Sequence, residues 1–188
     1  MTPLWPGATV AVLGGGPSLT LRQIEHVRGR CRIIAINRAY RLMPEADWLH
    51  AADKWWWEEH PDALAFQGVK TTCQAGVDPR VIFIRPSGIW GFEDDPSRVR
   101  TGLCSGYQAI QFAVRSGASR VLLLGYDGHG GNWHEGYSRP TVAYERHCVV
   151  EYRKLVPHVA KRGVEILNCS PASIYDAFPI VGVADILK

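Results

Sequence analysis

The sequence predicts an α/β fold in which a mostly parallel sheet is covered by helices on both faces. Apolar runs of strand character, at 8–13, 32–36 and 120–124, alternate along the chain with segments of helical periodicity. Such alternation is typical of a parallel sheet, and unbroken apolar strands need cover on both faces. A chain of 188 residues fits one domain of ordinary size. We therefore expect a single Rossmann-like, three-layer α/β/α domain over residues 1–188.

The other elements are predicted from the same signals. The first helix is expected at Ser18–Val27 with Ser18 as its N-cap, and a later one at Ser105–Ser116, capped by Ser105. The segment from Arg85 to Leu103 reads as a long loop, and long loops in compact domains are often functional. Further strands are expected at Trp48–Ala52, Val69–Thr72, Val81–Ile84 and Val164–Leu167, and helical segments at Asp53 to about Phe66, Val142–Arg162 and Ala172–Ala177.

Composition narrows the class of protein. Hydrophobic residues make up 46% and charged residues 21%, which is typical of a globular chain. The net charge of +3 is modest and the arginines are scattered, so DNA is permitted as a partner without being indicated. Five separated cysteines argue against a disulfide framework and favour a reducing compartment. No run approaches the roughly eighteen apolar residues of a membrane span, so we expect a cytoplasmic protein.

A glycine-rich turn follows the first predicted strand, in Gly14-Gly15-Gly16-Pro17-Ser18. A strand, a tight turn and a helix in this order direct backbone N–H groups and a helix dipole at one point, which suits a phosphate. The dinucleotide fingerprint is broken at its third glycine, and no acidic residue follows the second strand, so an NAD enzyme is disfavoured. The alternative is that the glycines serve tight packing only.

Polar residues follow several of the other predicted strands. In parallel sheets ligands bind beyond the carboxyl ends of the strands, where these residues should gather. Asn37 could bind a ribose or merely stabilise a turn, and Asp53 could cap a helix or contact the ligand. The residues expected to bind a nucleotide are Gly14, Gly15, Gly16, Pro17, Ser18, Asn37, Asp53, Ser105, Gly106, Tyr126 and Asp127, with Asn168–Ser170 close to them.

Three histidines are candidates for a general base, because imidazole titrates near neutrality. His134 is ranked first, His147 second, and His129 third. For each of them a non-catalytic polar role is equally compatible with the sequence. A metal site from His129, His134 and either Glu135 or Asp127 is weakly indicated, because loop histidines at this spacing have no fixed geometry.

Two further features allow both a structural and a functional interpretation. The run of three tryptophans at 55–57 covers a wider arc than one buried helix stripe, so at least one should face solvent, a ligand or another subunit. Two core tryptophans and one oligomer contact are favoured over a stacking platform. Cys104, beside the start of a helix, is a candidate activated thiol, although an inert buried cysteine is favoured.

A succession of short motifs carries a family resemblance: Gly14–Leu19, Ala35–Asn37, Ser105–Tyr107, Val121–Asp127 and Asn168–Pro171. In this order they resemble the bacterial sialyltransferases of glycosyltransferase family 42, and related phage and bacterial proteins grouped with the pterin pyrophosphokinase-like family. The resemblance covers most of the chain. It implies a metal-independent, inverting transferase that uses a cytidine nucleotide sugar and often forms oligomers.

The same resemblance implies roles for individual residues. Gly14–Ser18 and Asn37 would hold the donor phosphate and ribose, and Ser105-Gly106 would contact the donor. The chain departs from the pattern at Gly15, where those sialyltransferases have Asn, and at the leaving-group tyrosines, which His129 and Tyr137 only approximate. Sialic acid specificity is therefore not supported.

The sequence thus predicts a nucleotide-dependent transferase, and specifically a glycosyltransferase that needs no cofactor beyond its nucleotide-sugar co-substrate. The acceptor hydroxyl would belong to a small molecule, a glycan or, in a phage setting, a modified DNA base in the host cytoplasm. One alternative is a pyrophosphokinase or other phosphotransferase with a divalent ion held by Asp53 and Asp127. The other is a non-catalytic nucleotide-binding module that assembles into a homo-oligomer.

Overall fold

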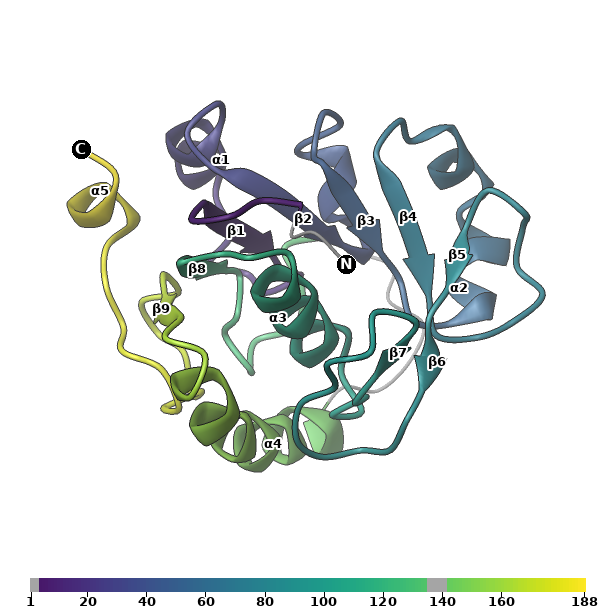
Figure 1. The fold of residues 1–188 in the computed structure, drawn as a ribbon. Helices are drawn as coiled ribbons and strands as arrows, with labels where there is room; N and C mark the ends of the chain where they lie inside the picture. The colour runs from purple at the N-terminus through teal and green to yellow at the C-terminus, as the bar shows by residue number, and fades with distance from the viewer. Residues whose placement is uncertain (1–3, 135–141) are drawn as a thin grey trace.

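A seven-stranded sheet, in which every strand pairing is parallel, forms the centre of the molecule (Figure 1). The computed structural model describes residues 4–134 and 142–188. The strands are β1 (Thr9–Leu13), β2 (Arg32–Ile36), β3 (Trp48–His50), β4 (Val69–Thr72), β5 (Ile82–Phe83), β8 (Arg120–Leu124) and β9 (Glu165–Asn168). Their order across the sheet is β5-β4-β3-β2-β1-β8-β9. The predicted three-layer α/β class is confirmed at this level.

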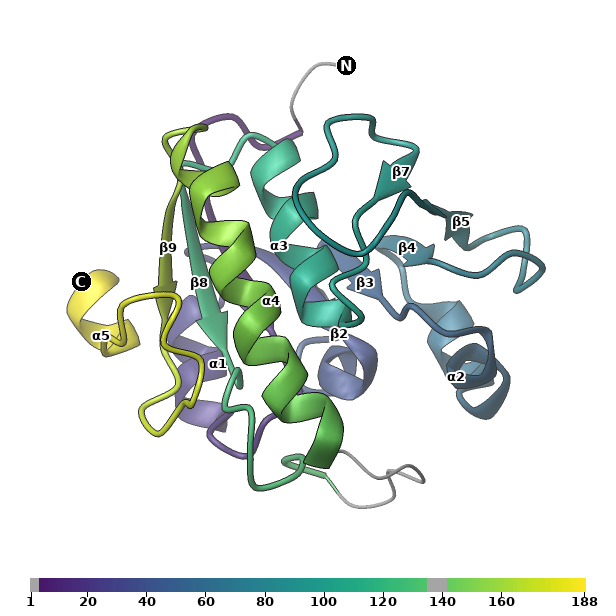
Figure 2. The same ribbon diagram turned by 90° about the horizontal axis from the view of Figure 1, so that it is seen from below.

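Helices cover both faces of this sheet (Figure 2). The helices are α1 (Leu21–Val27), α2 (Lys54–Glu59), α3 (Ser105–Arg115), α4 (Val142–Ala160) and α5 (Val183–Ile186), with 3₁₀ helices η1 (Asn37–Arg41) and η2 (Pro61–Ala65). Side chains alternate across the central strand: Val10 and Val12 face the core under α3 and α4, whereas Ala11 and Leu13 face the core under α1, α2 and α5. The chain therefore has one hydrophobic core on each face of the sheet.

Strand β1 is the most deeply buried element, since Val10, Ala11, Val12 and Leu13 are all 0% exposed. It pairs with β2 on one side and β8 on the other, so its backbone is hydrogen-bonded along both edges. This is the environment in which an unbroken apolar run is favoured. The same reasoning explains why the strands predicted at 32–36 and 120–124 have the bounds observed.

Helix boundaries differ from the predictions where a local capping contact decides them. Helix α1 begins at Leu21, because Thr20 and Gln23 form a capping box, so the prediction of Ser18 as N-cap was wrong. Helix α3 has Cys104 as its N-cap, which makes Ser105 its first helical residue.

Other boundaries were misplaced by a few residues. Strand β3 ends at His50, and the helix expected from Asp53 to Phe66 divides into α2 and η2 at His60-Pro61. The last strand begins and ends one residue later than predicted, and α4 ends at Ala160. Residues 172–177 form turns, and the C-terminal helix is α5 instead.

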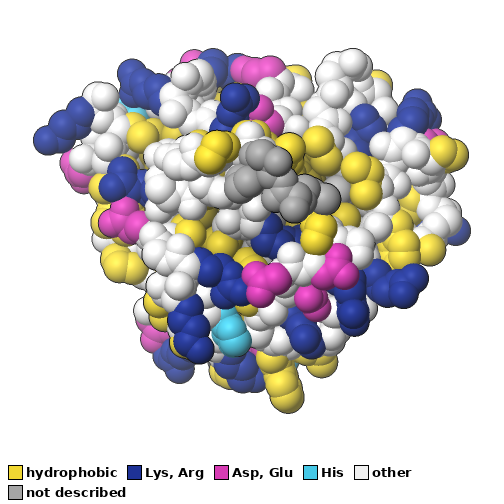
Figure 3. Space-filling view, in the orientation of Figure 1, with side chains coloured by type: hydrophobic (Ala, Val, Ile, Leu, Met, Phe, Trp, Pro, Cys, Tyr) yellow, Lys and Arg dark blue, Asp and Glu magenta, His cyan; other side chains and the backbone are white. Residues whose placement is uncertain are grey.

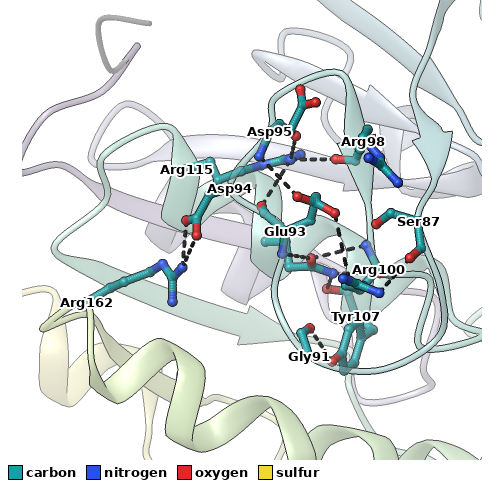
Figure 4. A network of polar contacts seen from close by, with 11 residues as sticks. Ser87, Gly91, Glu93, Asp94, Asp95, Arg98, Arg100, Tyr107, Arg115 and Arg162 are labelled. Carbon is teal, nitrogen blue, oxygen red and sulfur yellow. Dashed lines mark hydrogen bonds and ion pairs between the residues drawn. The ribbon is translucent and has the colours of Figure 1, made fainter.

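The long segment between β5 and α3 is ordered by contacts with α3. It contains a two-stranded parallel sheet of β6 (Arg85–Pro86) and β7 (Arg98–Val99). Figure 4 shows the Arg115 guanidinium, from the end of α3, donating to backbone carbonyls of this segment. The Nη1–O distances are 2.7 Å to Asp95 and 2.6 Å to Arg98. The segment predicted as a loop thus has an ordered structure of its own, and it leads directly into the start of α3.

On the face seen in Figure 3, Lys and Arg side chains lie in small groups among Asp and Glu side chains. Many of the basic residues are paired, for example Arg32 with Asp47 at 2.9 Å and Arg162 with Asp94 at 2.6 Å. The modest net charge is therefore dispersed on this face. None of the helices within 4–134 and 142–188 is long and apolar enough to cross a membrane.

Replacement of Arg115 by Met should destabilise the protein by about 1–3 kcal/mol, because it removes the donor that holds three loop carbonyls and leaves them short of partners. Urea unfolding followed by circular dichroism measures this difference. Arg120→Met is the matched control, since Arg120 makes an exposed ion pair with Glu165, and should cost less than about 1 kcal/mol. Equal effects of the two substitutions would contradict the anchoring role of Arg115.

Candidate functional site

A cavity of about 680 Å³ lies beyond the carboxyl ends of the strands. The strand order reverses between β1 and β8, because β2 to β5 extend to one side and β9 to the other. Such a reversal is where open parallel sheets bind ligands. The structure brings most of the predicted site residues together there: the cavity is lined by Gly14, Gly15, Gly16, Asn37, Asp53, Ser105, Gly106, Tyr126, Asp127 and His129, whereas Pro17 and Ser18 do not line it.

The glycine turn packs against the turn that follows β8. The N–H of Gly16 donates to the carbonyl of Gly125 at 2.8 Å, and the Asp127 carboxylate accepts from the hydroxyl of Ser18 at 2.9 Å and from its N–H at 3.3 Å. A Cβ at Gly16 would lie 2.0 Å from this carboxylate. Since most N–H groups of the turn are used internally, the expected helix-terminus phosphate cradle is not formed at Ser18.

Helix α3 presents more free backbone donors than the glycine turn. Its first turn carries N–H groups on Ser105, Gly106 and Tyr107, and no group in the described structure accepts from them. The Cys104 side chain makes no capping hydrogen bond to this turn. Two of the three residues, Ser105 and Gly106, line the cavity. The positive end of an eleven-residue helix therefore faces the cavity.

Tyrosine side chains line the cavity beside the first turn of α3. Tyr126, Tyr152 and Tyr175 line the cavity, and the hydroxyl of Tyr126 donates to the carbonyl of Gly106 at 3.1 Å. Burial raises the pKa of Tyr126 and Tyr152 well above the usual range, so both hydroxyls are neutral. A Cβ at Gly106 would lie 2.4 Å from the Tyr152 hydroxyl. The glycine after Ser105 is thus required by this close approach.

The charges of the cavity wall are unevenly distributed. Asp53 and Asp127 contribute carboxylates, and none of the described residues that line the cavity is Lys or Arg. Asp53 follows β3 and Asp127 follows β8, and the Asp127 carboxylate lies against the glycine turn, whereas the N-terminus of α3 supplies partial positive charge. An anionic group is therefore favoured at α3, and hydroxyl groups or a cation are favoured near the glycine turn.

The three candidate histidines lie in different places. His129 lines the cavity, and its Nε2 lies 2.6 Å from the carbonyl of Ala172, so Nε2 carries a proton and donates it. No described group contacts its Nδ1. His134 lines a smaller pocket beside the cavity. His147 is on α4, 42% exposed, and pairs with Glu151 at 3.6 Å without lining either space.

Asn168, Ser170 and Ser173 support the cavity without lining it. The Ser170 hydroxyl accepts from the N–H of Tyr126 at 2.7 Å, and the Ser173 hydroxyl donates to the Tyr126 carbonyl at 2.6 Å. The Asn168 amide donates to Ser173 at 2.9 Å. The segment after β9 therefore fixes the backbone at Tyr126 and Asp127.

The tryptophan run divides between core and cavity. Trp56 and Trp57 are 2% and 3% exposed, and the indole of Trp57 donates to the Ala51 carbonyl at 3.0 Å. Trp55 lines both the cavity and the smaller pocket. Helical spacing predicted that at least one of the three indoles would face solvent, a ligand or another subunit, and Trp55 faces the cavity.

The candidate thiol lies in an apolar environment. The Cys104 sulfur is 3.2 Å from the Tyr152 hydroxyl and contacts the Cys148 thiol, whose pKa is raised through that contact and by burial. Cys73, which also lines the cavity, has its pKa raised to about 12 by burial. These surroundings favour protonated thiols over an activated thiolate.

The residues considered for a metal site do not form a cluster where they are described. No group of three His, Cys, Asp or Glu side chains within the described residues could hold an ion. Glu135 and Tyr137, the remaining candidates for roles in this loop, lie outside the described residues. Asp127 already accepts two hydrogen bonds from Ser18.

A buried polar network that the sequence did not predict lies behind the cavity wall and fixes Gln108, one of the lining residues. His50 is fully buried; its Nε2 donates to Gln108 Oε1 at 2.7 Å, and its Nδ1 accepts from the hydroxyl of Thr71 at 3.0 Å. The Gln108 amide in turn donates to the Thr101 carbonyl at 2.9 Å, at the cavity wall. The signal available in the sequence was the position of Gln108, in the first turn of the helix predicted from Ser105. Asn132, Tyr152 and Tyr175 carried no comparable signal.

Known proteins give little guidance. No family model matches the chain, and no curated protein matches it. Among solved structures, a xylose isomerase-like TIM barrel/4-hydroxyphenylpyruvate dioxygenase fusion protein is 12% identical over 87% of this chain and 22% of that chain, with a TM-score of 0.21. A xylose isomerase domain protein from Planctomyces limnophilus is 13% identical over 88% of this chain and 53% of that chain, also with a TM-score of 0.21. Similarities this weak carry no argument about fold or function.

The His50 network predicts a loss of stability in acid. Burial lowers the pKa of His50 to about 4, whereas the unfolded chain binds a proton near the ordinary value of about 6.5. The free energy of unfolding is therefore unaffected by His50 above about pH 6.5, and it falls by up to about 3 kcal/mol as the pH drops toward 4. Urea unfolding between pH 4 and 7 measures this, and subtracting the profile of His50→Gln isolates the contribution. Parallel profiles for the two proteins would contradict it.

Proposed function

We propose that the protein is a Rossmann-like, nucleotide-dependent transferase, and that it moves a sugar from a cytidine nucleotide donor to an acceptor hydroxyl without a metal ion. The phosphate of the donor would bind at the N-terminus of α3. The observation that carries this proposal is the set of three N–H groups at Ser105, Gly106 and Tyr107, two of which belong to cavity-lining residues at the sheet reversal. Oriented N–H groups at a helix start bind phosphate well.

The carboxylates favour one orientation of the ligand. With the Asp127 carboxylate against the glycine turn, a phosphate there would meet negative charge, whereas ribose or sugar hydroxyls could donate to it. Asn37 adds an uncharged side chain on the same side. The sequence predicted the phosphate at the glycine turn, whereas this orientation puts the phosphate at α3 and hydroxyl groups of the ligand at the glycine turn. The resemblance to family 42 supports the cytidine donor and sugar transfer.

His129 is the proposed general base. Its Nε2–H is held by the Ala172 carbonyl, which leaves the Nδ1 lone pair for a ligand in the cavity. In the reaction the acceptor oxygen forms a bond to the anomeric carbon as its proton passes to Nδ1. The bond from that carbon to the phosphate oxygen breaks, and the phosphate leaves with the electron pair. The N–H groups of α3 stabilise the developing charge.

Binding of nucleotides tests the proposal first. CMP should raise the melting temperature in the presence of EDTA, and cytidine, which lacks the phosphate, should raise it much less. Stabilisation that requires ATP with Mg²⁺ would favour the phosphotransferase alternative, and no stabilisation by any nucleotide would favour an assembly module. The same panel with UMP, AMP and GMP measures the preference for the base.

Ser105→Pro removes one N–H from the proposed phosphate site and should weaken CMP binding about tenfold or more. Proline suits this first helical position, Cys104 before it is already extended, and the lost N–H has no internal partner. Ser105→Ala is the control that keeps the N–H, and cytidine affinity should be similar in all three proteins. Unchanged CMP affinity in Ser105→Pro, measured by calorimetry, would place the phosphate elsewhere.

The catalytic step is tested separately with His129→Ala. The release of CMP from a CMP-linked sugar, with water as acceptor, should fall about a hundredfold or more, because the proton acceptor is lost. The affinity for CMP should change little. His147→Ala is a control on an exposed side chain outside the cavity. A variant of His129 that retains full turnover would exclude it as the base.

A further inference from the structure

Among the described residues, two that are not glycine have a left-handed backbone, and both line the cavity. Asn37 has a φ of 49° and Leu103 a φ of 54°. Asparagine adopts this conformation readily, whereas in leucine it brings Cβ too close to a carbonyl oxygen. Strained residues of this kind are concentrated at ligand sites. The left-handed leucine beside the cavity therefore requires a physical explanation.

Leu103 lies in a tight turn that runs from Thr101 to Cys104. The N–H of Cys104 donates to the carbonyl of Thr101 at 3.0 Å and closes the turn. Both central residues, Gly102 and Leu103, have positive φ, as in a type I′ turn. The Thr101 carbonyl also accepts from the side-chain amide of Gln108 at 2.9 Å. These contacts fix the turn, so Leu103 is held in its left-handed conformation.

Neither the backbone nor the hydrophobic cores explain a leucine at this position. Type I′ turns favour glycine, asparagine or aspartate at their central positions. The Leu103 side chain is 48% exposed, and it belongs to neither core cluster of the described residues. A contact with a ligand in the cavity would account for this apolar side chain.

Leu103 forms an apolar part of the cavity wall together with Cys73 and Pro86. Gln108 connects this part, because its side chain lies 3.3 Å from the Cys73 thiol and 2.9 Å from the carbonyl of Thr101, where the turn begins. Proline has no N–H, leucine has no polar side-chain atom, and the thiol of Cys73 already donates to Gln108. Sugar hydroxyls against this wall would lose hydrogen bonds to water, whereas the face of a nucleobase would not.

The apolar part of the wall lies away from the glycine turn. Cys73 follows β4, and two strands, β3 and β2, lie between β4 and β1 in the sheet. Three spacings between neighbouring strands amount to roughly 14 Å. Asp53 and Asn37 line the cavity after β3 and β2, within this interval. Ribose hydroxyls would therefore find polar side chains between the apolar part of the wall and the glycine turn.

We propose that Leu103 contacts the nucleobase of the donor, and that the base lies against the apolar wall of Leu103, Pro86 and Cys73. This inference rests on the proposed function, which puts the phosphate at the N-terminus of α3. The Cα atoms of Leu103 and Ser105 are at most about 7 Å apart, because a chain spans no more than about 3.6 Å per residue. A mononucleotide separates its base from its phosphate by a single ribose, so one ligand can reach both residues.

Replacement of Leu103 by Asn tests this inference, because asparagine suits the left-handed turn but provides no apolar surface for a base. The melting temperature of the protein without nucleotide should not fall. Affinity for CMP should fall about fivefold or more. Affinity for ribose 5-phosphate, which has no base, should stay the same. Titrations followed through the α3 amide signals in NMR measure both affinities, including weak ones.

Two further variants serve as controls. Leu103→Met keeps an apolar side chain of similar volume and should retain CMP affinity within about twofold. Leu21→Asn makes the same change at a 68% exposed leucine, the first residue of α1, and should leave both affinities unchanged. In the unmodified protein, nuclear Overhauser effects between the Leu103 methyl protons and the cytosine ring protons of bound CMP should be observed. This measurement does not depend on the folding of a variant.

The outcomes separate this inference from the proposed function. Unchanged CMP affinity in Leu103→Asn, or an equal loss of affinity for CMP and ribose 5-phosphate, would overturn the inference and leave the proposed function standing. A lower melting temperature of that variant, or no Overhauser effect from Leu103 in the CMP complex, would overturn it as well. If CMP does not bind to the unmodified protein, the proposed function fails, and the inference fails with it.

Discussion

The contact between the glycine turn and the turn after β8 is the constraint on which the rest of the site depends. The Asp127 carboxylate and the Gly125 carbonyl approach the backbone at Gly16 so closely that a Cβ would lie 2.0 Å and 2.6 Å from them. The same contact joins the two strands at which the sheet order reverses. A side chain at Gly16 would separate these strands and widen the base of the cavity, so packing alone explains this glycine.

That packing has an electrostatic consequence. A buried carboxylate beneath the glycine turn occupies the N–H of Ser18 and adds negative charge where a phosphate cradle was predicted. The positive end of the site is supplied instead by α3, whose first turn is left uncapped by the side chain of Cys104. Because the described cavity wall contains no Lys or Arg, its fixed charges come from the carboxylates of Asp53 and Asp127 and from the terminus of a helix.

The sequence predicted those parts of the structure that depend on local pattern. Apolar runs located β1, β2, β4 and β8 closely, and most of the residues predicted to bind a nucleotide line the cavity beyond the carboxyl ends of the strands. Where the prediction failed, a contact between distant residues decided the outcome. Ser18 was expected to cap a helix, but it bonds to Asp127, 109 residues later. The apparent loop at 85–103 is ordered by α3, through the Arg115 guanidinium, which no periodicity reveals.

The ranking of the histidines stays a prediction, but the structure shows a property of each ring that the sequence could not reveal. Sequence gives the presence of an imidazole, but its chemistry depends on which nitrogen is already engaged. In His129 the Nε2–H donates to the carbonyl of Ala172. In His134 the Nδ1 atom accepts a hydrogen bond from the Arg38 guanidinium. The position of an imidazole in the sequence therefore does not determine which of its nitrogens is engaged.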